Sequence, residues 1–141
     1  MENNQKLFVE DKLQIDTVTS DFFKIFNNTN AKKPGWDTLY ETCIPEAIII
    51  KKTGPSETIY SLASFIEPRQ LILTNGTLIN FSEWELNEET KITGQIAQRF
   101  SRYQKAGCLN GKDFTADGTK LFQFVKTSNG WKITAMVWED D

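Results

Sequence analysis

The sequence contains no histidine, only two cysteines and no long apolar run. Without an imidazole, catalysis that uses histidine as acid, base or activator of a nucleophile is excluded. Cys43 and Cys108 lie far apart, so neither a disulfide framework nor a zinc site is indicated, and we interpret both as small apolar core residues. No stretch approaches the ~20 apolar residues of a membrane span, and residues 1–12 lack the apolar segment of a signal peptide. We therefore expect a cytoplasmic protein that does not bind membranes.

Charge and length exclude further classes of protein. The net charge of −3 offers no basic surface for nucleic acid or anionic lipid. The 141 residues suit one domain, 1–141, and the 39% apolar content is too high for a disordered chain. No glycine-rich phosphate loop and no metal-ligand spacing is present, so we expect no metal and no cofactor.

Aromatic residues are plentiful, with ten Phe, four Trp and three Tyr. They exceed what a minimal core requires, and the excess is available to line a cavity. Helical spacing of apolar residues predicts three helices and β-branched runs predict two short strands in the first half. The helices are expected at 8–26, at 36–43 and from Ser61 onward, where Pro68 either starts or kinks the third, and the strands at 47–50 and 58–60.

The second half predicts a meander of long strands. Alternation and turn residues place the strands at 78–88, 91–105, 112–127 and 131–139. A two-residue turn at Asn129-Gly130 pairs Phe124 with Ala135 on one face and places Trp138 on the other. Apolar groups on both faces predict a sheet covered twice, by helices and by a partner subunit, and hence a homodimer through the outer sheet face.

The order of these elements resembles that of the nuclear-transport-factor-2-like superfamily and its SnoaL-like branch. The C-terminal segment GTKLFQFVKT (118–127), followed by NGWKI (129–133), is similar to that family's final strand, turn and Gly-Trp-basic-Ile strand. The resemblance implies an α+β fold in which a cone-shaped, curved antiparallel sheet wraps around the N-terminal helices and leaves a conical pocket. Family members are isomerases, cyclases, dehydratases, ligand binders or assembly modules, so the fold does not fix the function.

Aromatic side chains at inward positions are the candidates for a ligand-binding pocket in this cone. The ligand-binding residues we predict are Trp36, Tyr40, Trp84, Phe100, Phe122, Phe124 and Trp131. Trp36 and Tyr40 share a helical face that is either a pocket wall or ordinary core. Trp84 lies on the strand face opposite Glu83 and Glu85, and we expect it to point into the pocket.

Catalytic candidates are fewer: Tyr103, Glu83 and Arg99. Glu83 and Glu85 share a strand face; buried, they suit acid–base chemistry, and exposed, they form a solvated edge. Arg99 and Tyr103 share a face with Ser101 between them, a pattern that suits a carboxylate or carbonyl ligand or, alternatively, a polar dimer face with Arg99 paired to a glutamate.

Three functions remain open from the sequence. The first is binding of a small apolar ligand in the conical pocket. The second is an isomerase, cyclase or dehydratase acting on a carbonyl compound, with Tyr103 stabilising an oxyanion and Glu83 as base. The third is a dimerisation or scaffold module. Enzymes of the family commonly use a pocket Asp, His or Tyr, so the absence of histidine favours binding over catalysis.

Overall fold

The computed structural model describes residues 2–141, with side chains from residue 8 onward. The elements are α1 (Glu2–Lys24), η1 (Thr29–Ala31), α2 (Trp36–Thr42), β1 (Cys43–Thr53), β2 (Ser56–Tyr60), α3 (Leu62–Thr74), β3 (Leu78–Thr93), β4 (Ile96–Leu109), β5 (Lys112–Thr127) and β6 (Gly130–Asp140). Their order confirms the helices and the late meander that the sequence predicts.

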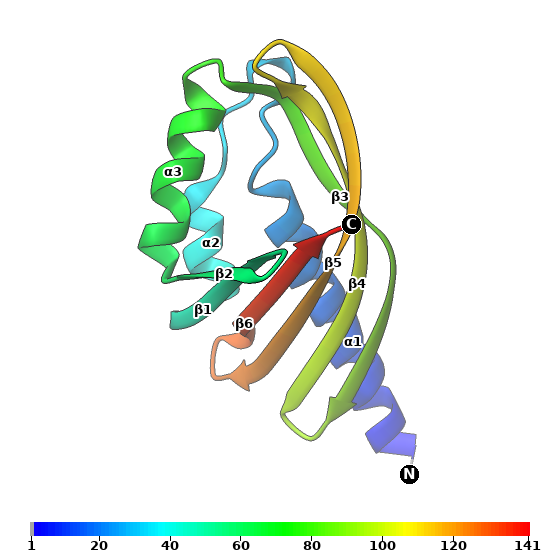
Figure 1. Cartoon of the computed structure of the whole chain (residues 1–141). Coiled ribbons are helices and arrows are strands. Elements are labelled where there is room, and N and C mark those ends of the chain that lie inside the picture. The colour runs from blue at the N-terminus through cyan, green and yellow to red at the C-terminus, as the bar shows by residue number, and fades with distance from the viewer. Residues whose placement is uncertain (1) are drawn as a thin grey trace.

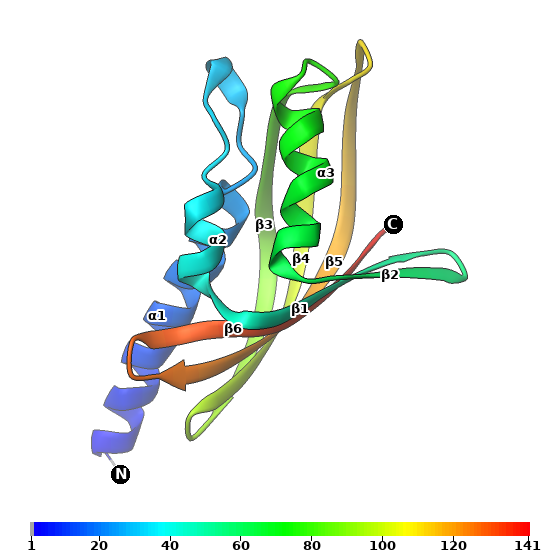
Figure 2. The same ribbon diagram turned by 90° about the vertical axis from the view of Figure 1, so that its left-hand side faces the viewer.

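A six-stranded sheet carries the structure, in the order β2-β1-β6-β5-β4-β3. Neighbouring strands run antiparallel except β1 and β6, which are parallel, so the sheet is mixed rather than wholly antiparallel as expected. The long strands β3 to β5 curve, and the helices lie on the inner side of that curve (Figures 1 and 2). The result is the predicted α+β cone.

Asn28 joins three elements near the end of α1. Its side-chain amide donates to the carbonyl oxygens of Leu73 on α3 (3.0 Å) and Leu78 on β3 (2.8 Å), and its Oδ1 accepts from the Phe81 N–H (2.7 Å). Phe81 follows Asn80, whose φ of 52° marks the irregularity at which β3 shifts register against β4. A buried amide with satisfied hydrogen bonds fixes its neighbours in one arrangement. Asn28 therefore holds the two elements that border the cavity described below.

The Ser61 cap sets the position of α3. The Ser61 hydroxyl accepts from the Ser64 N–H (3.2 Å), and the Ser64 hydroxyl accepts from the Ser61 N–H (2.9 Å). This reciprocal pair starts the helix at Leu62, so Pro68 lies within α3 and does not begin it.

The hairpin between β3 and β4 lies further along the chain than predicted. The strands meet at Thr93 and Ile96, with Gly94 at a φ of +56°, and not at residues 88–91. The polar run that suggested a turn instead continues the strand, because Glu88 pairs with Lys12 on α1 (2.9 Å). In a turn, the Glu88 carboxylate would be solvated by water; in the strand, the Lys12 ammonium group takes that place.

The predicted pairing of the last two strands is wrong. Phe124 pairs with Ile133 and not Ala135, because Thr127 pairs directly with Gly130 and the register shifts again at Thr134. A bulge of one residue moves every later side chain to the opposite face. Trp138 therefore lies on the inner face of the sheet, beside Lys120 of β5.

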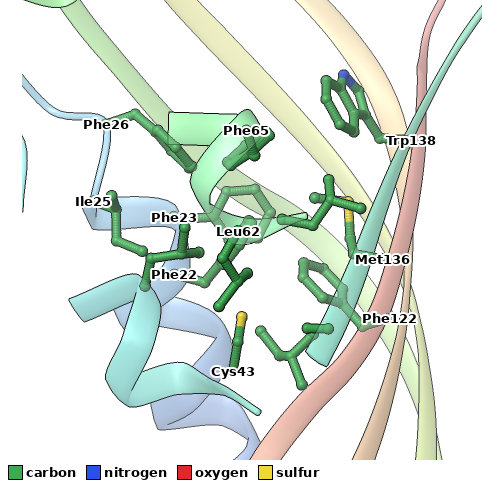
Figure 3. Close-up of a cluster of buried hydrophobic side chains, with 14 of the residues drawn as sticks. Phe22, Phe23, Ile25, Phe26, Cys43, Leu62, Phe65, Phe122, Met136 and Trp138 are labelled. Carbon is green, nitrogen blue, oxygen red and sulfur yellow. The ribbon is translucent and has the colours of Figure 1, made fainter. Parts of the chain in front are cut away.

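Aromatic side chains fill the space between α1 and the sheet. Phe22 lies fully buried, with ring centroids 5.5 Å from Phe26 and 5.4 Å from Phe122, both edge-on (Figure 3). Edge-to-face pairs of this kind stabilise a core beyond the area they bury. Phe65 of α3 and Trp138 of β6 stand at the border of this cluster, with centroids 5.9 Å apart.

The outer face of the sheet is uncovered in the single chain. Phe100 is 49% exposed, Leu121 44% and Ile48 47%. The prediction that helices cover one face is confirmed, whereas the predicted partner subunit on the other stays a prediction. Within residues 2–141, no helix combines the length and apolar character needed to cross a bilayer.

Candidate functional site

A cavity of about 270 Å³ lies inside the cone, between α3 and the inner face of the long strands. Its walls are mainly aromatic and aliphatic, with five charged side chains among them. The lining residues are Phe22, Phe26, Lys51, Phe65, Arg69, Ile72, Leu73, Leu78, Phe81, Glu83, Lys105, Leu109, Phe114, Lys120 and Trp138. Larger hollows of about 500 and 800 Å³ lie over the outer sheet face. Unlike the inner cavity, neither is lined by an ion pair in which both side chains are buried.

Lys120 and Glu83 form a buried ion pair in the cavity wall. Lys120 Nζ lies 3.0 Å from Glu83 Oε1, and the two side chains are 5% and 7% exposed. This buried oxygen has Lys120 as an ionic partner but no hydrogen bond among the described residues. Burial lowers the pKa of Lys120, and the attraction of Glu83 offsets this only in part. The pair therefore lies where both charges are costly to hold.

Aromatic rings surround the Lys120 ammonium group. Its Nζ lies 4.2 Å from the ring centroid of Tyr103 and 5.0 Å from that of Trp138. A desolvated cation gains free energy over such faces, which compensates some of its lost hydration. Rings accept no conventional hydrogen bond, so Glu83 Oε1 is the one oxygen that the described residues place beside the Lys120 ammonium group.

The Tyr103 hydroxyl is hydrogen-bonded to the carboxylate of Asp140. Its hydroxyl donates to Asp140, which also accepts from Lys105 Nζ at 2.7 Å. Burial and the Asp140 carboxylate raise the pKa of Tyr103. Burial acts to raise the pKa of Asp140, but the hydrogen bonds from Lys105 and Tyr103 outweigh it and lower that pKa. Tyr103 does not line the cavity, so the structure does not place its hydroxyl where an oxyanion donor was expected.

Two further cations stand at Trp138. The Arg69 guanidinium carbon lies 5.3 Å from the Trp138 ring centroid and 4.0 Å from that of Phe65, and Lys51 Nζ lies 5.9 Å from Trp138. Burial lowers the pKa of Arg69. The cavity is thus lined by four cations and one carboxylate.

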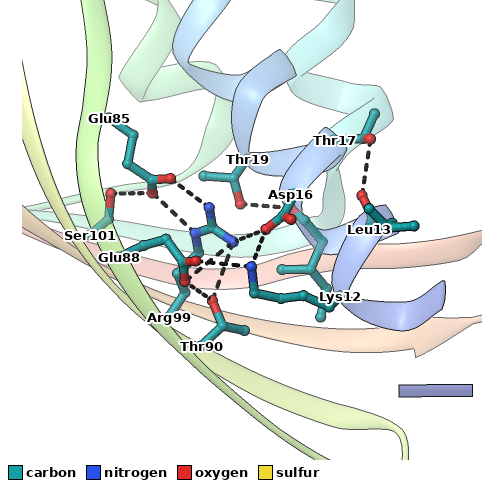
Figure 4. Close-up of polar contacts among 11 residues, drawn as sticks. Lys12, Leu13, Asp16, Thr17, Thr19, Glu85, Glu88, Thr90, Arg99 and Ser101 are labelled. Carbon is teal, nitrogen blue, oxygen red and sulfur yellow. Dashed lines mark hydrogen bonds and ion pairs between the residues drawn. The ribbon is translucent and has the colours of Figure 1, made fainter. Parts of the chain in front are cut away.

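Arg99 lies inside the cone but serves a different contact. It is 3% exposed and donates to both oxygens of Glu85 (3.0 and 2.5 Å) and to Asp16 of α1 (2.6 Å), as Figure 4 shows. Burial acts to lower the pKa of Arg99, but these hydrogen bonds outweigh it and raise that pKa. Ser101 also donates to Glu85 (2.6 Å). The network fixes α1 to the sheet, so the pairing of Arg99 with a glutamate is present, but on the inner face and not on a dimer surface.

The predicted ligand-binding aromatics lie elsewhere in the molecule. None of them lines the inner cavity. Three are buried in the core (Phe122, Phe124 and Trp131), one is half-buried (Trp36), and three are exposed (Tyr40, Trp84 and Phe100). Trp84 points outward, contrary to expectation, because Glu83 and Glu85 occupy the inner face, where each finds a cation. Of the predicted catalytic residues, Glu83 alone lines the cavity.

The cavity cations were missed by sequence reasoning, although one pattern indicates them. Lys120 alternates with Phe122 and Phe124, so strand periodicity alone places it on an apolar inner face. Arg69 and Lys51 carry no comparable pattern. As for metals, no group of three His, Cys, Asp or Glu side chains in the part of the chain that the structure describes is arranged to hold an ion.

Comparisons with known proteins bear on the fold. No protein-family model matches the sequence, and no curated protein does. Solved structures do match. A nuclear-transport-factor-2-like protein with a cystatin-like fold from Novosphingobium aromaticivorans is 12% identical, with a TM-score of 0.74 over 97% of this chain and 86% of that one. A nuclear-transport-factor-2-like superfamily protein from Salmonella enterica is 12% identical, with a TM-score of 0.75 over 93% and 91%.

A third match is an enzyme, the type 2 hexachlorocyclohexane dehydrochlorinase LinA. It is 10% identical, with a TM-score of 0.76 over 94% of this chain and 86% of that one. The chain therefore has the nuclear-transport-factor-2-like, cystatin-like fold that its sequence resembles. Identities this low establish the fold and leave the chemistry to the site itself.

Proposed function

We propose that the protein binds a small, largely apolar molecule in the inner cavity. Aromatic and aliphatic side chains from α1, α3 and the long strands form most of its wall. A volume of about 270 Å³ corresponds to roughly nine water molecules at ~30 Å³ each, so the ligand has about ten non-hydrogen atoms. Mostly apolar walls with a few fixed polar groups are typical of small-molecule sites.

The single observation that carries this proposal is the burial of Lys120 in the wall. A charged amine, 5% exposed and with one oxygen partner, is costly to keep inside a protein. It suits a site that orients a ligand by one polar contact and surrounds the remainder with apolar groups.

Calorimetric titration with neutral aromatic probes of the right size, indole and naphthalene, tests the proposal. Ile72 of α3 lines the cavity, whereas its neighbour Leu71 is 61% exposed on the outside of the same helix. We expect Ile72→Trp to fill the cavity and abolish binding, and Leu71→Trp to bind as the wild type does. Failure of both probes to bind the wild type, or equal binding by Ile72→Trp, would refute it.

A second candidate function is catalysis on a carbonyl compound, as an isomerase, cyclase or dehydratase. The observation that favours it is Glu83 Oε1, a buried oxygen in the cavity wall without a hydrogen bond. In this scheme Lys120, and not Tyr103, holds the substrate oxygen, and Glu83 removes a proton from the adjacent carbon. The test is deuterium uptake from D₂O into phenylacetone, followed by NMR. We expect uptake with the wild type and none with Glu83→Gln; uptake no faster than in buffer would exclude this candidate.

We also propose that the protein forms a homodimer through the outer sheet face. Phe100 and Leu121 are exposed there, beside Glu89 and Lys91, so the face offers an apolar patch with charges of both signs next to it, which suits a self-complementary two-fold interface. Sedimentation is expected to give a dimer for the wild type and for Leu71→Glu, which alters the far side, and a monomer for Phe100→Glu. A wild-type monomer would exclude both the dimer and the scaffold alternative.

A further inference from the structure

We infer that the ligand of the inner cavity is an organic anion, an apolar body of about ten non-hydrogen atoms with one carboxylate held by Arg69. This inference rests on the proposed binding function and names the class of ligand. It is drawn from the cations that meet in the cavity and from the partners those cations lack.

Three cationic groups from different elements converge on one indole ring. Arg69 of α3, Lys120 of β5 and Lys51 of β1 lie 5.3, 5.0 and 5.9 Å from the Trp138 ring centroid. Because all three distances end at the same ring centroid, no two of these cations can be more than about 11 Å apart. Like charges so close repel in a partly desolvated space, and an anion between them removes that repulsion.

The carboxylates within the cone do not balance these charges. Lys120 is paired with Glu83 and Lys105 with Asp140. Arg69 and Lys51 have no carboxylate within 4.0 Å among the residues whose side chains the structure describes.

Arg69 has hydrogen-bonding capacity to spare. Its guanidinium makes one protein hydrogen bond, from Nη1 to the Phe65 carbonyl oxygen (3.1 Å), although the group carries five donors. The guanidinium carbon lies 4.0 Å from the Phe65 ring centroid and 4.9 Å from that of Tyr60, so its protein neighbours are largely rings, which accept no conventional hydrogen bond. A guanidinium edge matches a carboxylate by two parallel hydrogen bonds.

Arg69 is the cation best suited to hold a carboxylate. Arg69 and Lys51 are both half-buried, but only Arg69 carries a planar fork of donors that a carboxylate can meet with two parallel hydrogen bonds. A monocarboxylate neutralises it, and the walls formed by Phe26, Phe65 and Ile72 then take the apolar remainder of the molecule. Purely structural stacking of Arg69 on Phe65 is the competing interpretation, and it predicts no preference for acids.

Matched probe pairs separate the two interpretations. Calorimetric titration compares 3-phenylpropionate with 3-phenylpropionamide, and octanoate with octanamide, since each pair differs in charge but hardly in size. We expect each acid to bind the wild type at least about tenfold more tightly than its amide, with the preference falling as salt is added. Arg69→Gln is expected to remove the preference and to leave amide affinity within about twofold.

Arg102→Gln is the matched control. Arg102 pairs with Asp141 outside the cavity, so the variant loses an arginine but is expected to retain the preference for acids. Equal binding of acids and amides by the wild type would overturn the inference, as would a preference that survives in a folded Arg69→Gln protein. In either case indole and naphthalene still report on the proposed function, because they carry no charge. If these neutral probes also fail to bind, both proposals fall.

Discussion

The buried pair of Lys120 and Glu83 gives the sharpest test of how the cone is built. Lys120→Met removes the ammonium group but keeps a side chain of similar length. Glu83, at 7% exposure and with no hydrogen bond to Oε1, is then left as an unpaired charge inside the protein. Breaking a buried pair in this way typically costs about 3–5 kcal/mol of unfolding free energy.

That cost is large for a chain of this size. A domain is stable by about 5–15 kcal/mol, so the variant loses about a fifth or more of the total. For domains near this length, 1 kcal/mol moves the melting temperature by about 2–4 °C, and Lys120→Met is expected to melt about 10 °C below the wild type. In contrast, Glu83→Leu together with Lys120→Met removes both charges, and we expect its stability to lie within about 1 kcal/mol of the wild type or above it.

Urea unfolding followed by far-UV circular dichroism measures these differences, with Lys52→Met as the control. Lys52 pairs with Glu57 on the surface, where the two side chains are 39% and 56% exposed, and its loss is expected to cost less than about 1 kcal/mol. The reasoning is refuted if Lys120→Met costs no more than Lys52→Met, or if the double variant is less stable than Lys120→Met alone.

Three further predictions concern groups around the cavity. Arg99→Met strands Glu85 and is expected to cost about 3–5 kcal/mol in urea unfolding, and near wild-type stability would contradict the network. Gly118→Ala places a Cβ 2.7 Å from a backbone carbonyl oxygen and into the Tyr103 phenol, so its melting temperature should fall by several degrees; an unchanged value would show that the phenol moves freely. Asp140 has a lowered pKa in the folded protein, so its contribution is present above the unfolded value of 3.8 and is lost as pH falls through the folded pKa. The stability difference between wild type and Asp140→Asn should accordingly be constant near neutral pH and shrink below about pH 4, and a difference that grows toward acid would contradict the assignment.

Local patterns were sufficient to predict the fold but not the end of every strand. Apolar spacing and turn residues place all three helices and the meander, because both report on which face of an element meets the core. The turn at 88–91 was wrong because Glu88 is polar for a reason that lies on another element, the ammonium group of Lys12. A polar run within a strand is indistinguishable from a turn in the sequence, because the partner that makes it part of the sheet lies far away in the chain.

The site was harder to predict because it depends on register. Strand alternation from an ideal turn sends Trp138 to the outer face, and only the bulge at Thr134 returns it to the inner face beside Lys120. Arg69 meets Trp138 through the packing of α3 against the sheet, a contact that no local spacing encodes. Of the seven aromatic residues chosen as ligand contacts, three fill the solid part of the cone and three are exposed, since composition cannot separate a lining residue from a core or surface residue.

The two parts of the cone interior obey different physical rules. Around Phe22 and Phe122 the space is filled by rings in mutual contact, an arrangement that stability alone explains. Around Lys120 the chain keeps an ammonium group whose pKa burial lowers, next to a carboxylate oxygen without a hydrogen bond. Apolar side chains in place of such a pair are often neutral or stabilising, so folding does not require these charges. Functional sites are commonly less stable than the rest of a fold. If the double variant Glu83→Leu/Lys120→Met is more stable than the wild type but no longer binds indole or naphthalene, Glu83 and Lys120 serve ligand binding at a cost in stability.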